Sequence, residues 1–168
     1  GRRYMIDNQI IATVIVHLFI AIVQLMLWRK STPQRFLSVG GSLLALILAF
    51  KLFFKVYDGG ILTMNAANWK APFGIVFVAD LFSSTLVVLT SVAGLAVSIF
   101  SCVGVGRQRI LYGYFPIFHF LMMGLNGAFL TGDIFNLYVW FEVIIISSFV
   151  LMTLGGRKSQ LEGAVKYM

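Results

Sequence analysis

One carboxylate, Glu142, stands inside a long apolar stretch of the sequence. The stretch reads GDIFNLYVWFEVIIISSFVLM, from Gly132 to Met152, and no other charged side chain lies between Asp133 and Arg157. An ionised side chain near the centre of a bilayer costs at least about 2.5–3.5 kcal/mol, so such a residue usually serves a transport pathway or has a buried partner. The chemistry available to it is the binding and release of a proton. Glu142 is therefore the first candidate functional residue.

Other polar residues near Glu142 recur at helical spacing. His119, Asn126 and Asp133 are seven residues apart, a spacing that drifts only about 20° around a helix. If one helix continues through Asp133, they form one polar stripe, and Tyr138 and Glu142 share a face of the next helix. Antiparallel packing would bring the two stripes together, and such a chain, with waters between, can conduct protons. Alternatively, His119 and Asn126 only make interhelical hydrogen bonds.

Four further residues have open or structural interpretations. Asp80 is either a solvated or helix-end carboxylate or a functional group. Glu162 and Lys166 have the spacing of an i,i+4 helical pair, and Lys166 alternatively faces a channel. His17 lies in the middle of the first apolar run without an obvious partner, and we interpret it as a packing residue.

The chain has one cysteine and no nucleotide-binding, paired-cysteine or nucleophile–base motif, so we expect no cofactor and no metal.

The composition indicates which elements position these residues. Of 168 residues, 60% are hydrophobic and 11% are charged, which leaves too few charges to cover a soluble domain. Apolar runs of membrane-spanning length recur, so the predicted fold class is all-α, a polytopic helical membrane protein with no soluble domain. The net charge of +7 does not indicate nucleic acid, because the basic residues lie in short connectors between apolar runs. The expected surroundings are a lipid bilayer.

Five transmembrane helices and the start of a sixth are predicted. The expected ranges are about 9–28, 36–57, 77–103, 115–130 and 135–154, with the sixth starting at 163. The turn formers of residues 61–74 indicate an interfacial loop, with or without a short hairpin. The break at 131–133 is short enough to make the fourth and fifth spans antiparallel neighbours. Because the sequence stops just as a span begins, we expect a fragment of a longer protein.

The orientation follows from the basic residues of the connectors. Positive connectors face the cytoplasm, which places the N-terminus outside a plasma membrane that the chain crosses several times. Arg2 and Arg3 argue against this orientation, but three connectors outweigh one tail. The basic residues in the connectors are Arg29, Lys30, Arg35, Arg107, Arg109, Arg157 and Lys158.

The segment from Phe115 to Met168 carries a family resemblance. It reads FPIFHFLMMGLNGAFLTGDIFNLYVWFEVIIISSFVLMTLGGRKSQLEGAVKYM, and it resembles the proton-translocating subunits of the Mrp antiporter and complex I superfamily. Within it, GAFLTGDIFNLYVWFEV followed by LGGRKSQLEGAVKY is similar to the D subunit of the Mrp-type multisubunit Na⁺/H⁺ antiporter. Upstream, FGIVFVADLFSS is similar to the third-helix region of the same subunits. The resemblance covers roughly Gln34 to Met168.

The resemblance implies a secondary transporter component rather than an enzyme. The implied partners are other membrane subunits of the complex, and the implied ions are H⁺ and Na⁺ or another monovalent cation. It places the essential proton-channel carboxylate of the fifth helix at Glu142, whose usual lysine partner lies two helices later, beyond Met168. Two alternatives stay open: a proton-pumping subunit of an NADH:quinone oxidoreductase or membrane-bound hydrogenase complex, and a membrane scaffold in which Glu142 forms only a structural ion pair.

Overall fold

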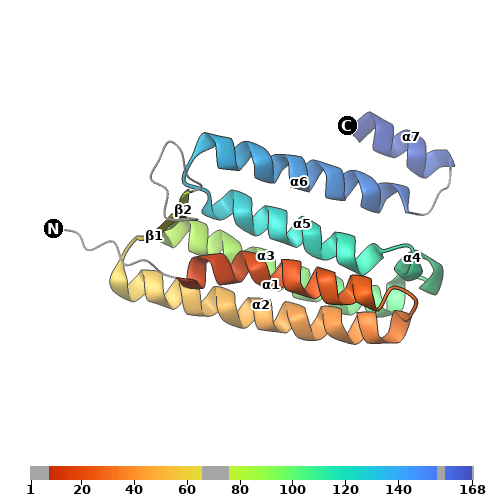
Figure 1. The fold of residues 1–168 in the computed structure, drawn as a ribbon, viewed down its shortest axis with the longest axis horizontal. Coiled ribbons are helices and arrows are strands. Elements are labelled where there is room, and N and C mark those ends of the chain that lie inside the picture. The colour runs from red at the N-terminus through yellow and green to blue at the C-terminus, as the bar shows by residue number, and fades with distance from the viewer. Residues whose placement is uncertain (1–7, 66–75, 155–157, 168) are drawn as a thin grey trace.

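Five long helices packed side by side form most of the molecule. The computed structural model describes residues 8–65, 76–154 and 158–167. The chain runs up and down through the long helices (Figure 1), which are α1 (Asn8–Met26), α2 (Ser31–Gly59), α3 (Leu81–Gly104), α5 (Tyr114–Leu130) and α6 (Ile134–Thr153). The shorter elements are β1 (Leu62–Asn65), β2 (Val76–Ala79), α4 (Arg107–Leu111) and α7 (Lys158–Tyr167).

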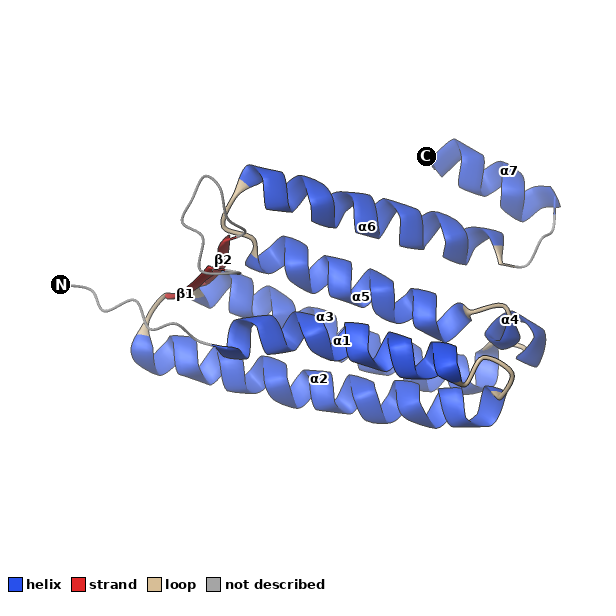
Figure 2. Cartoon of the chain, in the orientation of Figure 1, coloured by secondary structure: helices blue, strands red, loops and turns tan. Residues whose placement is uncertain are grey.

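The small sheet and the basic connectors lie at opposite ends of the bundle. Figure 2 shows β1 and β2 at one end, whereas the turn between α1 and α2 lies beside α4 at the other. Helix α5 packs against α1, α3 and α6, and α2 packs against both α1 and α3. Helix α6 lies on the outer side of α5 (Figure 1), and its buried residues are Asn136 and Ser147.

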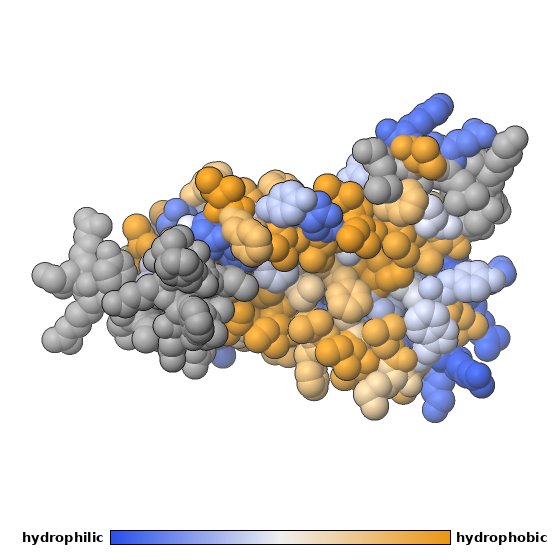
Figure 3. All heavy atoms as spheres, turned by 45° about the horizontal axis from the view of Figure 1, so that its top comes forward, coloured by the Kyte–Doolittle hydropathy of each residue, from blue (hydrophilic) through white to orange (hydrophobic). Residues whose placement is uncertain are grey.

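The long helices are apolar enough to cross a membrane. In the described residues, four helices reach the necessary length and hydropathy, namely α1, α2, α3 and α6, and α5 is an apolar helix of 17 residues. Figure 3 shows apolar side chains over most of the middle of the bundle, with hydrophilic residues gathered toward one end. Such a surface requires a lipid or protein cover rather than water. The expected all-helical membrane fold is confirmed.

The third span begins later than the sequence indicated. Residues 76–79, assigned in part to a helix starting at 77, form strand β2 and pair with β1, so that Leu62 lies opposite Ala79. A short apolar run of β-branched residues is ambiguous between helix and strand. Asp80 then begins α3, because its side chain accepts a hydrogen bond from the Ser83 amide at 2.7 Å. A hairpin within 61–74 is thus confirmed only for its first strand, and residues 66–75 lie outside the described residues.

Two other helices begin earlier than expected. Helix α2 starts at Ser31 rather than near 36 and includes Pro33 in its first turn, although proline breaks a helix at interior positions. Proline is tolerated in the first turn because the first amides of a helix have no intrahelical partner. Helix α7 starts at Lys158 rather than 163. The five-residue helix α4, inside the connector between the third and fourth spans, was not predicted.

Candidate functional site

Glu142 lies on the outward face of α6. Its side chain is exposed, and so are the apolar neighbours that share its face one turn away, including Val139, Ile145 and Ile146. Figure 3 shows this side of the molecule, where a hydrophilic area interrupts the apolar surface over α6. Within the described part of the chain, Glu142 has no hydrogen bond and no ion pair. The structure therefore presents an unpartnered carboxylate in the middle of an apolar surface, and not a buried one.

Tyr138 shares the face of Glu142, one turn earlier on α6. Its side chain is 63% exposed, so its hydroxyl can meet whatever covers that face. Lys166 and Glu162 are both exposed on α7, and no ion pair joins them within the described residues. The interpretation of these two residues as a helical ion pair therefore has no support in the structure. Among the residues that the structure describes, Lys166 is an unpaired cation next to the helix that carries Glu142.

Asp133 fastens the start of α6 to the small sheet. Its Oδ1 atom accepts a hydrogen bond from the Asn136 amide at 2.6 Å, and its Oδ2 atom accepts one from the Val76 amide at 3.0 Å. Asp133 is the N-cap of α6, and α5 ends three residues earlier, at Leu130. The condition that one helix continue through Asp133 is not met. Both oxygens of this carboxylate are used to position the helix.

Helix α5 directs its polar side chains toward α1 rather than α6. His119 and Asn126 are 0% and 1% exposed. The Asn126 amide donates to the Thr13 carbonyl of α1 at 2.9 Å. Toward α6, α5 presents Gly124 and Gly127, which allow the two helices to approach closely. The expectation that the two polar stripes meet is therefore wrong for the described structure, since His119 and Glu142 lie on opposite sides of α5.

His17 has the partner that the sequence did not reveal. Its Nδ1 atom lies 3.0 Å from Nδ1 of His119, and the two rings are stacked with centroids 5.3 Å apart. The Nε2 atom of His119 lies 2.9 Å from Oγ of Ser38, and Ser38 is hydrogen-bonded to Ser98. The interpretation of His17 as a mere packing residue missed this chain of four side chains. The available signal was two intramembrane histidines on separate spans.

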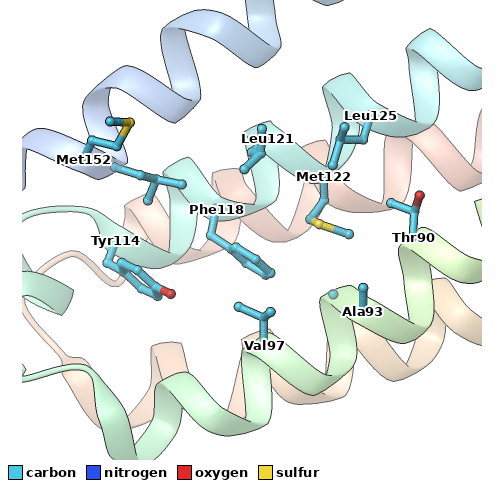
Figure 4. A pocket seen from close by; sticks show the side chains of 11 residues that line it. Thr90, Ala93, Val97, Tyr114, Phe118, Leu121, Met122, Leu125 and Met152 are labelled. Atoms are coloured by element: carbon cyan, nitrogen blue, oxygen red, sulfur yellow. The ribbon is translucent and has the colours of Figure 1, made fainter. Parts of the chain in front are cut away.

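An apolar groove lies between α3, α5 and α6. Its volume is about 510 Å³, and Figure 4 shows Phe118 and Met122 of α5 facing Ala93 and Val97 of α3 across it. The two polar groups at its edge are already hydrogen-bonded, the Thr90 hydroxyl to its own helix and the Tyr114 hydroxyl to Ser101. The groove offers space for apolar groups but no group that binds protons or ions.

Metal and thiol chemistry find no support in the described residues. No cluster of three or more histidine, cysteine or carboxylate side chains is close enough to hold a metal ion among them. Cys102 is a free thiol, and its Sγ atom lies 3.3 Å from the Ser98 carbonyl of its own helix. Glu142 and the histidine pair lie on different sides of α5.

No protein-family model matches the chain, but similar curated proteins exist. The Na⁺/H⁺ antiporter D subunit of Alkalihalophilus pseudofirmus is 38% identical over 162 residues, which are 96% of this chain and 33% of that protein. The D subunit of the Bacillus subtilis antiporter matches with the same identity and coverage. A putative antiporter component, mnhD2, of Staphylococcus epidermidis is 34% identical over 167 residues, or 98% of this chain and 33% of that protein. The chain thus spans about a third of the length of these relatives.

Two solved structures contain the same fold. A chain of the membrane-bound sulfane sulfur reductase, an archaeal respiratory membrane complex, matches 95% of this chain and 32% of its own length, with a TM-score of 0.82 and 26% identity. A chain of the Mrp complex from Dietzia sp. DQ12-45-1b matches 93% of this chain and 31% of its own length, with a TM-score of 0.78 and 25% identity.

Fold and sequence together define a multi-pass helical membrane protein of the type that is found in antiporter and respiratory membrane complexes. More specifically, the chain is a homologue of the D subunit of the Mrp-type Na⁺/H⁺ antiporters and matches about one third of that protein. The match extends over 96% of the chain and thus includes α1, which lay outside the resemblance recognised from the motifs.

Proposed function

We propose that this chain is part of a membrane subunit of a multisubunit Na⁺/H⁺ antiporter, in which Glu142 binds and releases the transported proton. The observation that carries the proposal is the placement of Glu142 on an exposed apolar face of α6 without a partner among the described residues. A carboxylate that faced lipid there would be costly. We infer that protein covers this face in the complete complex and encloses Glu142.

Two of the other candidate residues belong to the same face or its neighbourhood. Tyr138 lies one turn from Glu142, and Lys166 lies on the adjacent helix α7, so both can take part in a proton path once the face is covered. Asp133 and Asp80 have a different role in this account. They cap α6 and α3, and they position the helices rather than carry the proton.

The proposed surroundings are a plasma membrane and further membrane subunits. The basic residues of the turn between α1 and α2 and those of α4 lie at one end of the bundle (Figure 1), which we place at the cytoplasmic side because positive connectors stay inside. The N-terminus is then outside. H⁺ and Na⁺, or another monovalent cation, are the ions exchanged by the whole assembly.

Replacement of Glu142 by Gln tests the proposal. The full-length protein carrying Glu142→Gln is expressed with its complex in a sodium-sensitive host that lacks its own antiporters. We expect Na⁺-dependent proton flux in inverted vesicles to fall at least about tenfold, because glutamine cannot ionise; general acid–base groups typically contribute factors of 10²–10⁴. Glu142→Asp should keep part of the flux, since it retains a carboxylate.

Asp58→Asn is the matched control. It also removes one carboxylate, from the exposed last turn of α2, and should leave the flux unchanged. Equal fluxes in the wild type and Glu142→Gln, with the complex assembled in both, would rule out the proposed role of Glu142. Growth of the host in sodium should follow the flux.

A second candidate function is supported by the match to the respiratory complex. In that case the chain belongs to a proton-pumping subunit driven by a redox reaction, with Glu142 in the same role. The identity of 38% to antiporter subunits, against 26% to the respiratory chain, favours the antiporter. Purification of the complex decides between them, because a respiratory assembly brings redox cofactors with it. A scaffold role without proton transport is the outcome if Glu142→Gln leaves the flux intact.

A further inference from the structure

A hydrogen-bonded chain of buried side chains crosses the bundle on the side of α5 that faces away from Glu142. It runs from His17 on α1 through His119 on α5 to Ser38 on α2 and Ser98 on α3. The two histidine Nδ1 atoms are 3.0 Å apart, the His119 Nε2 and Ser38 Oγ atoms are 2.9 Å apart, and the serine hydroxyls are in contact. None of the four is more than 1% exposed. One polar chain therefore joins four helices.

The hydrogen bond between the two imidazole rings can hold only one proton. A ring nitrogen either carries a hydrogen and donates or lacks one and accepts, so a hydrogen bond between the two Nδ1 atoms holds a single proton. His119 uses both of its ring nitrogens, one toward His17 and one toward Ser38. An imidazole bonded in this way can accept a proton at one nitrogen and release one from the other. Serine hydroxyls, which both donate and accept, extend the same property.

Both ends of the chain lead toward further polar groups. At one end, Nε2 of His17 is buried and has no partner among the described residues. The Oδ1 atom of Asn126 is also buried and has no partner among the described residues. The side-chain NH₂ group of Asn126 donates to the carbonyl of Thr13, one turn before His17 on α1. At the other end, Ser98 is followed one turn later by Ser101, whose hydroxyl is bound to that of Tyr114 at 2.7 Å. The hydrogen-bonded series thus begins at an unpaired nitrogen of His17. Beyond Ser98, nearer the basic end of the bundle, lies the hydroxyl pair of Ser101 and Tyr114.

We propose that His17 and His119 form a second proton site, separate from Glu142, that passes protons from α1 to α3 through Ser38 and Ser98. A proton that reaches the buried Nε2 atom of His17 binds there, and the Nδ1 proton of His17 moves to Nδ1 of His119. The Nε2 proton of His119 moves to Ser38, the Ser38 hydroxyl proton moves to Ser98, and Ser98 releases its own toward the hydroxyl pair of Ser101 and Tyr114. One proton enters and one leaves. Both rings end in the opposite tautomer and return to the first before the next transfer.

No charged group is hydrogen-bonded to the pair in the described structure. The helices packed around it carry few other titratable side chains, and their positions in sequence place most of them toward the helix ends. These side chains are Arg35, Lys51, Lys55, Tyr57 and Asp58 on α2, Cys102 on α3 and Tyr114 on α5. The proton on the pair is therefore held by hydrogen bonds within the chain rather than by a salt bridge.

This inference rests on the proposed antiport function for its purpose, but proton sharing by the pair can be measured without transport. In the complete complex, labelled with ¹⁵N-histidine and embedded in bilayers, solid-state NMR should detect a nitrogen–nitrogen coupling across the bond between the two rings. The coupling should disappear in His17→Gln. Absence of the coupling in the wild type would overturn the proposal.

Flux measurements test the transfer step. Ser38→Ala and Ser98→Ala interrupt the chain and should each slow proton flux at least threefold, while Ser38→Thr, which restores a hydroxyl, should recover it. Ser91→Ala is the control, because Ser91 is also buried on α3 but donates only to its own helix at Val87. Unchanged flux in Ser38→Ala and Ser98→Ala would mean that these hydrogen bonds only hold the helices together and do not transfer protons.

The two proposals fail in different ways. If Glu142→Gln leaves the proton flux unchanged while Ser38→Ala slows it, the proposed role of Glu142 is wrong and the proposed role of the histidine pair is supported. If Glu142→Gln stops the flux while Ser38→Ala and Ser98→Ala do not change it, the pair is not on the route and Glu142 stands.

Discussion

At the scale of single residues, three carboxylates of this chain have different surroundings. Asp80 and Asp133 accept hydrogen bonds from backbone amides in the first turns of α3 and α6, so both carboxylates are bound at the starts of helices. Glu142 has no such partner among the described residues. Sequence spacing grouped Asp133 with His119 and Asn126 on the condition that one helix continue through Asp133, and α5 instead ends at Leu130, where the fourth span was expected to end.

Removal of the Asp80 cap should loosen the first turn of α3. Asp80 and Ser83 form a reciprocal pair in which each side chain bonds to the other's amide, and loss of such a cap costs about 1 kcal/mol. In Asp80→Ala, we expect the amides of that turn to exchange hydrogen about five times faster, as hydrogen–deuterium exchange can measure.

Asp80→Asn serves as the comparison, because asparagine also accepts hydrogen bonds at this position. It should exchange nearly as slowly as the wild type. Equal exchange rates in Asp80→Ala and the wild type would mean that the cap does not stabilise the start of α3.

At the scale of the elements, α5 has two different faces, one with polar side chains and one with glycines. The period of its polar residues was visible in the sequence and correctly placed His119 and Asn126 on one face. The neighbour of that face was not predictable, because α1 and α6 are both antiparallel to α5 and both carry polar residues. The packing decides it, since Gly124 and Gly127 admit the large side chains of α6 while the polar face meets Thr13 and His17 of α1.

A methyl group at position 127 should force α5 and α6 apart. A Cβ atom there would lie 2.3 Å from the indole of Trp140, and overpacking of this kind typically costs about 1–3 kcal/mol. We expect Gly127→Ala to lower the thermal stability of the complex and to change Trp140 fluorescence, because the indole must move. Glu142 lies half a turn from Trp140, so proton flux should fall as well.

Gly40→Ala is the matched control on α2. A Cβ atom at Gly40 meets nothing within 4 Å, and alanine has the higher helix propensity, so stability should be unchanged or slightly raised. If Gly127→Ala were as stable as Gly40→Ala, the close approach of α5 and α6 would be refuted.

At the scale of the whole molecule, the class of protein was predictable and the arrangement of its polar groups was not. Length and hydropathy suffice to predict the apolar helices, and the motif around Glu142 indicated the antiporter family that the comparisons then supported. The pairing of His17 with His119 joins residues 102 positions apart, and no local pattern encodes such a contact. The strand at residues 76–79 was missed because a short apolar run does not distinguish strand from helix.

The central claim, that Glu142 is protonated and deprotonated during transport, is tested most directly by infrared difference spectroscopy of the whole complex in bilayers. Acidification should produce the carbonyl band of a protonated carboxylic acid, and addition of Na⁺ should remove it. That band should be missing in Glu142→Gln and present in Asp58→Asn. An unchanged band in Glu142→Gln would contradict the account, because the proton would then be bound by another carboxylate.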